Sequence, residues 1–159
     1  MDQHLFDRVN IDKGNTAVPD GTAADPDAFC RAYEEKIDAL GGADIQVLGI
    51  GRNGHIGFNE PSDALIPGTH LTELTANTIE ANARFFASEE DVPKHALTMG
   101  IQSVFKARRI LLMASGKSKA EAIRAMLNVN ITTQCPASLL CLHTDVVLIC
   151  DQDAYSLVS

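Results

Sequence analysis

Three short apolar runs constrain the fold of this chain more than any other feature. They are IQVLGIG at residues 45–51, RILLMA at Arg109–Ala114 and VVLIC at Val146–Cys150. Each run has apolar side chains at successive positions, which is typical of a strand buried on both faces. Helical patterns separate the runs, and this alternation favours a parallel sheet covered on both sides. The sequence therefore predicts an α/β fold, a Rossmann-like three-layer sandwich with a mostly parallel sheet, in which ligands bind at the carboxyl ends of the strands.

The segments between these runs predict helices over residues 26–40, over 76–87 and over about 117–128. Asp25 is a favourable N-cap for the first helix, and Pro26 suits a first helical turn. The chain opens on helix-like sequence, and only three strands follow. We therefore interpret residues 1–159 as a single, partial domain that is incomplete at its N-terminal side. A three-stranded parallel sheet has exposed edges, so the isolated chain is expected to be weakly stable or self-associated.

The composition limits the partners of the chain. Its net charge is −8, from 13 basic and 21 acidic residues, which disfavours nucleic acid and anionic membranes. It has no run of about 18 apolar residues and no signal-peptide core, so the expectation is a cytoplasmic protein without a membrane partner. A homo-oligomer remains possible. A few local cations can still hold one small phosphate inside an acidic protein.

The four cysteines form no CxxC pair and stand among apolar or small residues. They are interpreted as buried free thiols, and no metal is expected. Cys141 and His143 are close in sequence, but no second pair of ligands accompanies them.

A glycine-rich segment, Gly49–Gly54, follows the first strand and fits the pattern GxGxxG. In dinucleotide-binding proteins these glycines open a helix. Here Gly57, Pro61 and Pro67 follow, and they oppose a helix. Dinucleotide binding is therefore kept only as an alternative.

The same glycines also suit a tight loop at a strand end, with Gly51 and Gly54 supplying the loop backbone. His55 would then stand at the mouth of the sheet, and histidine is suited to moving protons near neutral pH. Asn53 and Glu60 are the nearby groups that could orient its ring. The alternative is that Asn53 and Gly54 form an ordinary turn and that Glu60 is solvated.

Two other segments carry cations that could hold an anion. Ser115–Lys119 lies between a strand and a helix and resembles the end of a Walker A loop, but Leu111 stands where that motif needs glycine. A strand, a turn and a helix N-terminus still make an anion site, to which one lysine could add a clamp. The alternative is a solvated helix start. Arg84 precedes two phenylalanines, and the residues alone favour a structural role for it over an anion clamp.

The chain resembles the glucosamine-6-phosphate deaminase (isomerase) family over nearly all of its residues. The resemblance rests on LGIGRNGHIGFNEP, THLTELT, NARFF, DVPKHALTMGI, ILLMASGKSKAEAI, PASLLCLH and VVLICD, in that order. The related 6-phosphogluconolactonases share the glycine-rich turn and the histidine but lack the FNEP continuation.

The resemblance implies an enzyme of amino-sugar catabolism that converts glucosamine 6-phosphate and water to fructose 6-phosphate and ammonium without a metal or cofactor. The expected enzyme class is that of the hydrolases. By resemblance, His55 is the acid/base that opens the sugar ring, and Asn53 and Glu60 orient it. Arg84 and Lys119 hold the substrate phosphate.

Two departures from the family limit these expectations. Family members carry a phosphate loop and an Asp-Glu-Tyr motif, whose aspartate is the enolisation base, in a portion that does not match this sequence. The isolated chain is therefore expected to be inactive or nearly so. Allosteric members have basic residues after the signature, whereas DALIPGTHLTEL has no Lys or Arg, so no activation by N-acetylglucosamine 6-phosphate is expected. A non-catalytic sugar-phosphate-binding module and a 6-phosphogluconolactonase-like hydrolase remain alternatives.

Overall fold

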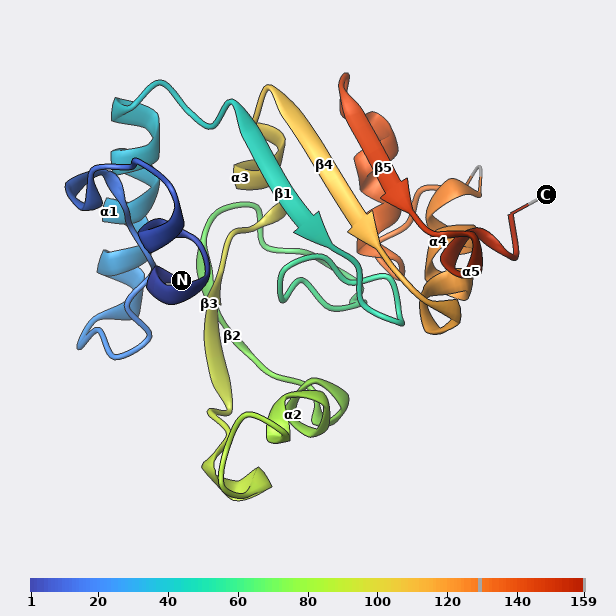
Figure 1. Cartoon of the computed structure of the whole chain (residues 1–159), viewed down its shortest axis with the longest axis horizontal. Coiled ribbons are helices and arrows are strands. Elements are labelled where there is room, and N and C mark those ends of the chain that lie inside the picture. The colour runs from blue at the N-terminus through green and yellow to red at the C-terminus, as the bar shows by residue number, and fades with distance from the viewer. Residues whose placement is uncertain (129, 159) are drawn as a thin grey trace.

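The computed structural model describes residues 1–128 and 130–158 and is built on one parallel sheet. The sheet contains β1 (Ile45–Gly49), β4 (Arg109–Ala114) and β5 (Val146–Cys150) in the order β1-β4-β5, with both pairs parallel (Figure 1). The α/β class, the parallel sheet and its three strands are confirmed. Strand β1 ends at Gly49, two residues before the end of the predicted run, because Ile50 and Gly51 already belong to the following turn.

The three predicted helices are present with altered ends. Helix α1 spans Pro26–Ala39, and the Asp25 carboxylate caps it by accepting a hydrogen bond from the Ala28 N–H at 2.9 Å. Helix α2 (Ala76–Ala83) is shorter than predicted, because residues 84–88 form turns and bends instead. The third predicted helix divides into a 3₁₀ turn, η5 (Lys117–Lys119), and α4 (Ala120–Leu127).

Several short elements were not predicted. Strands β2 (His70–Glu73) and β3 (His95–Thr98) pair antiparallel in a second, two-stranded sheet. Together with α2 they form a lobe that projects away from the parallel sheet (Figure 1). The remaining short elements are α3 (Ile101–Phe105), α5 (Gln152–Tyr155), η1 (Asp2–His4), η2 (Phe6–Arg8), η3 (Lys13–Asn15), η4 (Glu89–Asp91) and η6 (Pro136–Leu142).

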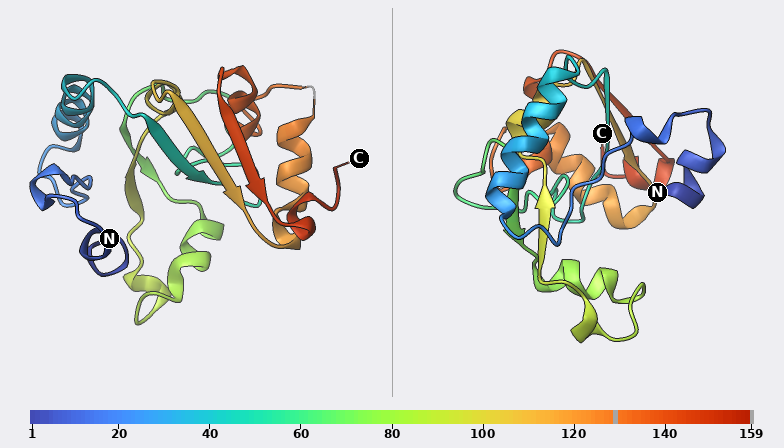
Figure 2. Two further views of the ribbon diagram at one scale, coloured as in Figure 1. Left: turned by 45° about the horizontal axis from the view of Figure 1, so that its top comes forward. Right: turned by 90° about the vertical axis from the view of Figure 1, so that its left-hand side faces the viewer.

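The hydrophobic core lies against one face of the parallel sheet. Ile110 and Leu112 of β4 are fully buried on this face, together with Ile123 of α4 and Leu140 of η6. Helices α3 and α4 lie behind the sheet in Figure 1 and on the same side of it in Figure 2. The opposite face carries exposed apolar side chains. The described residues thus supply two of the three expected layers.

Helix α1 lies beside the sheet and is held through Glu34. The Glu34 carboxylate accepts hydrogen bonds from the Thr69 N–H at 3.1 Å and from the Ser103 hydroxyl. Lys106 bridges the same helix by donating to Asp38 at 2.9 Å and to Glu34 at 3.3 Å. Within the described ranges, no helix combines the length and the hydropathy needed to cross a bilayer.

Candidate active site

The turn after β1 is shaped by glycines that leave room for neighbouring side chains. The Gly51 N–H donates to the His55 carbonyl at 2.8 Å, which closes the turn. A Cβ at Gly51 would lie 2.3 Å from the His55 ring. Gly54 has a φ of +84°, and a Cβ there would lie 2.6 Å from the Cys135 Sγ. Residues 50–69 contain no helix, so the second half of the dinucleotide fingerprint is absent, as the sequence predicted.

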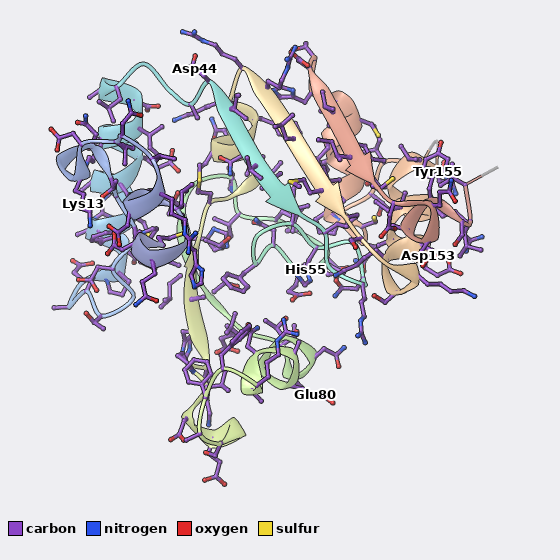
Figure 3. The ribbon with its side chains drawn as sticks, viewed as in Figure 1. Lys13, Asp44, His55, Glu80, Asp153 and Tyr155 are labelled. Atoms are coloured by element: carbon purple, nitrogen blue, oxygen red, sulfur yellow. The ribbon has the colours of Figure 1, made fainter. Side chains whose placement is uncertain are left out.

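The turn brings together His55, Asn53 and Glu60, the three residues predicted to carry the chemistry. His55 Nδ1 lies 2.8 Å from Asn53 Oδ1 and 3.2 Å from Glu60 Oε2. Asn53 Nδ2 donates to the same Glu60 oxygen at 2.7 Å. Because Nδ1 faces two acceptor oxygens, it carries the ring proton in the neutral form, and Nε2 is left as the basic nitrogen. Figure 3 shows His55 on the loops at the lower end of the parallel sheet, where its strands end.

Glu60 joins this turn to α2 through its second oxygen. Its Oε1 accepts hydrogen bonds from Thr78 Oγ1 at 2.9 Å and from Thr75 Oγ1 at 3.3 Å. Burial by itself raises the pKa of Glu60, but the hydrogen bonds from Asn53 and Thr78 and the nearby His55 outweigh it and hold the pKa below its ordinary value. The carboxylate is therefore ionised at neutral pH. Sequence reasoning missed Thr75 and Thr78; the one local signal was that Thr75 is a favourable N-cap for α2.

The FNEP segment holds this carboxylate in place through its asparagine. Asn59 is buried, and its Nδ2 donates to the carbonyls of Ile56 at 2.9 Å and Met99 at 2.8 Å. The Phe58 N–H donates to Thr98 Oγ1 at 3.0 Å. The FNEP segment is thus tied to the end of β3, which fixes the position of the backbone at Glu60.

Lys119 reaches the same turn from the end of β4. Its Nζ donates to the Ile50 carbonyl at 2.8 Å. Burial lowers the pKa of Lys119, and the nearby Arg52 guanidinium lowers it further. Two cations therefore lie close together at the carboxyl end of β1, an arrangement that a bound anion would stabilise. Sequence reasoning did not single out Arg52, although it lies within the signature.

The turn at Ser115 and Gly116 was predicted to bind an anion through its backbone, but a side chain of the protein already fills it. The Asp151 carboxylate already occupies it, accepting from the Gly116 N–H at 2.9 Å and from Ser115 Oγ at 2.9 Å. Asp151 also caps α5 by accepting from the Ala154 N–H at 2.8 Å. These hydrogen bonds lower the pKa of Asp151. The chain thus fills this backbone site itself, and Lys119 is left to act by its side chain.

Arg84 lies apart from the His55 turn. It ends α2, and its guanidinium carbon lies 4.7 Å from the centroid of the Phe85 ring. In residues 1–128 and 130–158, no hydrogen bond or ion pair joins it to His55, Glu60 or Lys119. Its connection to the site is indirect, because α2 begins beside Glu60.

The four cysteines are free thiols, and His143 has a structural role. All four cysteines are free, but only Cys30 and Cys135 are buried; Cys141 is exposed and Cys150 is half-buried, so the prediction of burial was wrong for these two. Their places at a helix end and at a strand end leave them accessible.

His143 uses both ring nitrogens, donating to the Ala107 carbonyl at 2.8 Å and accepting from the Asp145 N–H at 3.1 Å. The described part of the chain contains no cluster of His, Cys, Asp and Glu side chains able to hold a metal ion.

The chain matches one family of known proteins over most of its length. Residues 1–149 match the model of the family described as glucosamine-6-phosphate isomerases/6-phosphogluconolactonase. A glucosamine-6-phosphate deaminase of Clostridium perfringens is 53% identical over 158 residues. The match covers 99% of this chain but 65% of that relative, so the chain spans about two thirds of its length.

Two solved structures resemble this chain, one closely and one only in its fold. A monomeric glucosamine-6-phosphate deaminase superposes with a TM-score of 0.94 at 50% identity, covering 99% of this chain and 65% of that one. A 6-phosphogluconolactonase from Trypanosoma cruzi superposes with a TM-score of 0.62 at 18% identity, which shows a shared fold alone. The expectation of a hydrolase was wrong, because the close relatives are named as deaminases, and the solved one gives no support for a homo-oligomer.

Proposed function

The chain belongs to the family of glucosamine-6-phosphate isomerases and 6-phosphogluconolactonases, and from this we propose that it carries the ring-opening half of a glucosamine-6-phosphate deaminase site. The proposed overall reaction converts glucosamine 6-phosphate and water to fructose 6-phosphate and ammonium. One observation carries the proposal above all: His55 Nδ1 is held by Asn53 at 2.8 Å and by Glu60 at 3.2 Å, which leaves Nε2 as the base.

Ring opening needs one proton to move from the anomeric hydroxyl to the ring oxygen. Neutral His55 accepts the hydroxyl proton at Nε2 and becomes an imidazolium. As the bond between the anomeric carbon and the ring oxygen breaks, the imidazolium returns the proton to that oxygen. The Glu60 carboxylate stays ionised and stabilises the imidazolium between the two transfers.

The substrate phosphate is proposed to bind at Lys119, with Arg84 as a second clamp. Lys119 is supported by its position on the Ile50 carbonyl, two residues from Arg52. Arg84 is supported by its place at the end of α2, whose first turn contacts Glu60. Holding the phosphate end of the sugar keeps the anomeric carbon beside His55, which reduces the entropy lost on reaching the transition state.

These 159 residues are proposed to stop after ring opening. Moving the proton between the second and first sugar carbons needs a further base, expected in a motif that this sequence does not contain. Open-chain aminosugar would therefore re-close, and ammonium would not be released at a rate normal for an enzyme.

The test measures ring opening directly. The two anomers of glucosamine 6-phosphate exchange only through the open chain, so exchange spectroscopy by NMR reports the half-reaction that the proposal assigns to His55. We expect the isolated chain to accelerate this exchange, while an ammonium assay on the same sample remains near background. His55→Gln is expected to remove the acceleration, by roughly a hundredfold or more, and to keep binding in calorimetry.

A matched control is His95→Gln, because the His95 side chain is 53% exposed and lies 3.8 Å from Glu73. It should leave the exchange rate unchanged. Substrate binding without any acceleration of exchange would overturn the proposal and favour a non-catalytic binding module. Normal ammonium release by these 159 residues would contradict the proposed absence of the second base.

We also propose that a catalytically complete form is not activated by N-acetylglucosamine 6-phosphate. The hollow beside Glu60 is lined by residues from Phe58 to Thr72, and its only basic side chain is His70. A rate increase on adding this sugar phosphate would refute the proposal.

A further inference from the structure

Lys119 and Arg52 are two cations that lie close together at the carboxyl end of the parallel sheet. Gly49 of β1 pairs with Met113 of β4, so the turns that follow these two strands leave the sheet side by side. Lys119 Nζ donates to the Ile50 carbonyl at 2.8 Å, and Arg52 follows two residues later. In residues 1–128 and 130–158, neither side chain forms an ion pair with a carboxylate. The pair is therefore able to receive an anion.

The two cations differ in their chemistry. Arg52 is exposed, and a guanidinium stays protonated at physiological pH, so it can bind the oxygens of a phosphoryl group. Lys119 is half-buried, and burial together with the Arg52 charge lowers its pKa. At a given pH, more of its amine is therefore neutral than in an ordinary lysine, and the neutral amine is the nucleophile. The pair thus places a nucleophile beside an anion-binding group.

A ligand that suits both groups carries a phosphoryl group directly beside an electrophilic carbon. An acyl phosphate has this form, because a single oxygen joins its phosphorus to its carbonyl carbon. We propose that Lys119 is a site of acylation by small acyl phosphates, with Arg52 binding the phosphoryl group. This inference concerns a covalent modification and does not depend on the proposed reaction.

The transfer is balanced without a further reactant. The lone pair of the neutral Lys119 amine attacks the carbonyl carbon, and a nitrogen–carbon bond forms. The bond between that carbon and the bridging oxygen breaks, and phosphate leaves with the electron pair while Arg52 stabilises its charge. The amine proton passes to the departing phosphate. The product is an uncharged amide, so on the proposed function acylation removes a cation that holds the substrate phosphate.

Lys117 offers a comparison within the same 3₁₀ turn, η5. It is exposed, whereas Lys119 is half-buried and held on the Ile50 carbonyl. A reagent that selected lysines by exposure alone would favour Lys117. Faster acylation of Lys119 is therefore a sign that its surroundings direct the reaction.

The test treats the chain with acetyl phosphate at neutral pH and follows each lysine by peptide mass spectrometry. Lys119 is expected to react at least about tenfold faster than Lys117, because hydrogen bonds to a charged group hold the reagent at Lys119. Inorganic phosphate should slow the reaction at Lys119 and not at Lys117. Arg52→Gln should remove the preference for Lys119. Arg108→Gln is the matched control and should change neither rate, because Arg108 is exposed at the other end of β4 and pairs with Asp44 at 2.7 Å.

Acetic anhydride, an uncharged acetyl donor, separates binding by Arg52 from the reactivity of the amine. It gives Arg52 no anion to bind, so Arg52→Gln should slow its reaction with Lys119 much less than the reaction with acetyl phosphate. Three results would overturn the inference: equal rates at the two lysines with acetyl phosphate, a rate at Lys119 that inorganic phosphate does not lower, or an equal effect of Arg52→Gln on both donors. The first two are measured on the unaltered chain, so they do not require that a variant folds.

Discussion

Glu60 is the residue on which the candidate site depends most. Its two oxygens serve different partners: Oε2 faces His55 and Asn53, and Oε1 faces Thr75 and Thr78. The side chain is 14% exposed, so each lost partner would leave a buried polar atom unsatisfied. One carboxylate therefore orients the imidazole and also fixes the start of α2.

Glu60→Gln should destabilise the fold in a pH-dependent way. The pKa of Glu60 is lower in the folded chain than its ordinary value. Its ionised form therefore stabilises the fold above the unfolded pKa, and this contribution is lost as the pH falls through the folded pKa. We expect Glu60→Gln to lower the free energy of unfolding by about 1–3 kcal/mol at neutral pH.

Urea unfolding followed by circular dichroism from pH 7 toward about pH 3 checks this, because the unfolded carboxyl titrates near 4.3. The difference between the two proteins should shrink as the pH falls. Glu80→Gln is the control, since Glu80 is exposed on α2 (Figure 3). A difference that stays constant with pH would show that the ionised carboxylate is not responsible.

The elements that the sequence predicted are those whose pattern is local. The apolar runs identified β1, β4 and β5, and Asp25 with Pro26 marked the start of α1. Strands β2 and β3 were missed because each has four residues of mixed polarity, and each is stabilised only by its distant partner. The gathering of His55, Asn53 and Glu60 was predicted, but the contacts of Glu60 with α2 and of Asp151 with Gly116 were not. Both contacts join residues on separate elements, so the spacing of residues along the sequence could not predict them.

Helix α1 depends on a second carboxylate, Glu34. Burial by itself raises the pKa of Glu34, but hydrogen bonds from Ser103, Thr69 and Lys106 outweigh it and lower the pKa. Because α1 lies beside the sheet, few other contacts hold it. Loss of this carboxylate should therefore loosen α1 while the parallel sheet stays folded.

Glu34→Ala tests the role of this element. Hydrogen exchange in residues 26–39 should become faster by a factor that corresponds to about 1–3 kcal/mol, whereas exchange in β4 should not change. Glu35→Ala provides the comparison, because Glu35 is exposed on the same helix. Equal acceleration by both variants would mean that helix propensity, and not the Glu34 contacts, accounts for the effect.

The whole molecule has an asymmetric core. Ile110 and Leu112 of β4 are fully buried on one side of the strand, whereas Met113 on the other side is 51% exposed. The hydrophobic contribution of the sheet is thus only partly realised, because one face remains in contact with water. The sequence indicated this shortage through its small number of strands, but the uncovered face could be identified only from the packing.

The isolated chain should accordingly be weakly stable. We expect a free energy of unfolding below the usual range of about 5–15 kcal/mol, together with binding of the apolar dye ANS to the uncovered face of the sheet. Chemical unfolding and dye fluorescence measure the two quantities, and replacing Ile149 by Thr should reduce the fluorescence. A monomer with a high, cooperative melt and no dye binding would contradict this prediction.

The Asp151 carboxylate in the Gly116 turn limits where a sugar phosphate can bind. Without Asp151, the Gly116 N–H and the Ser115 hydroxyl would be free to bind a phosphate at the ends of β4 and β5. Because the protein's own carboxylate already occupies that turn, an incoming phosphate is repelled from it, and Lys119 and the neighbouring Arg52 remain as the cations beside the His55 turn. On the proposed function, Asp151 therefore directs the substrate phosphate away from the Gly116 turn and toward Lys119.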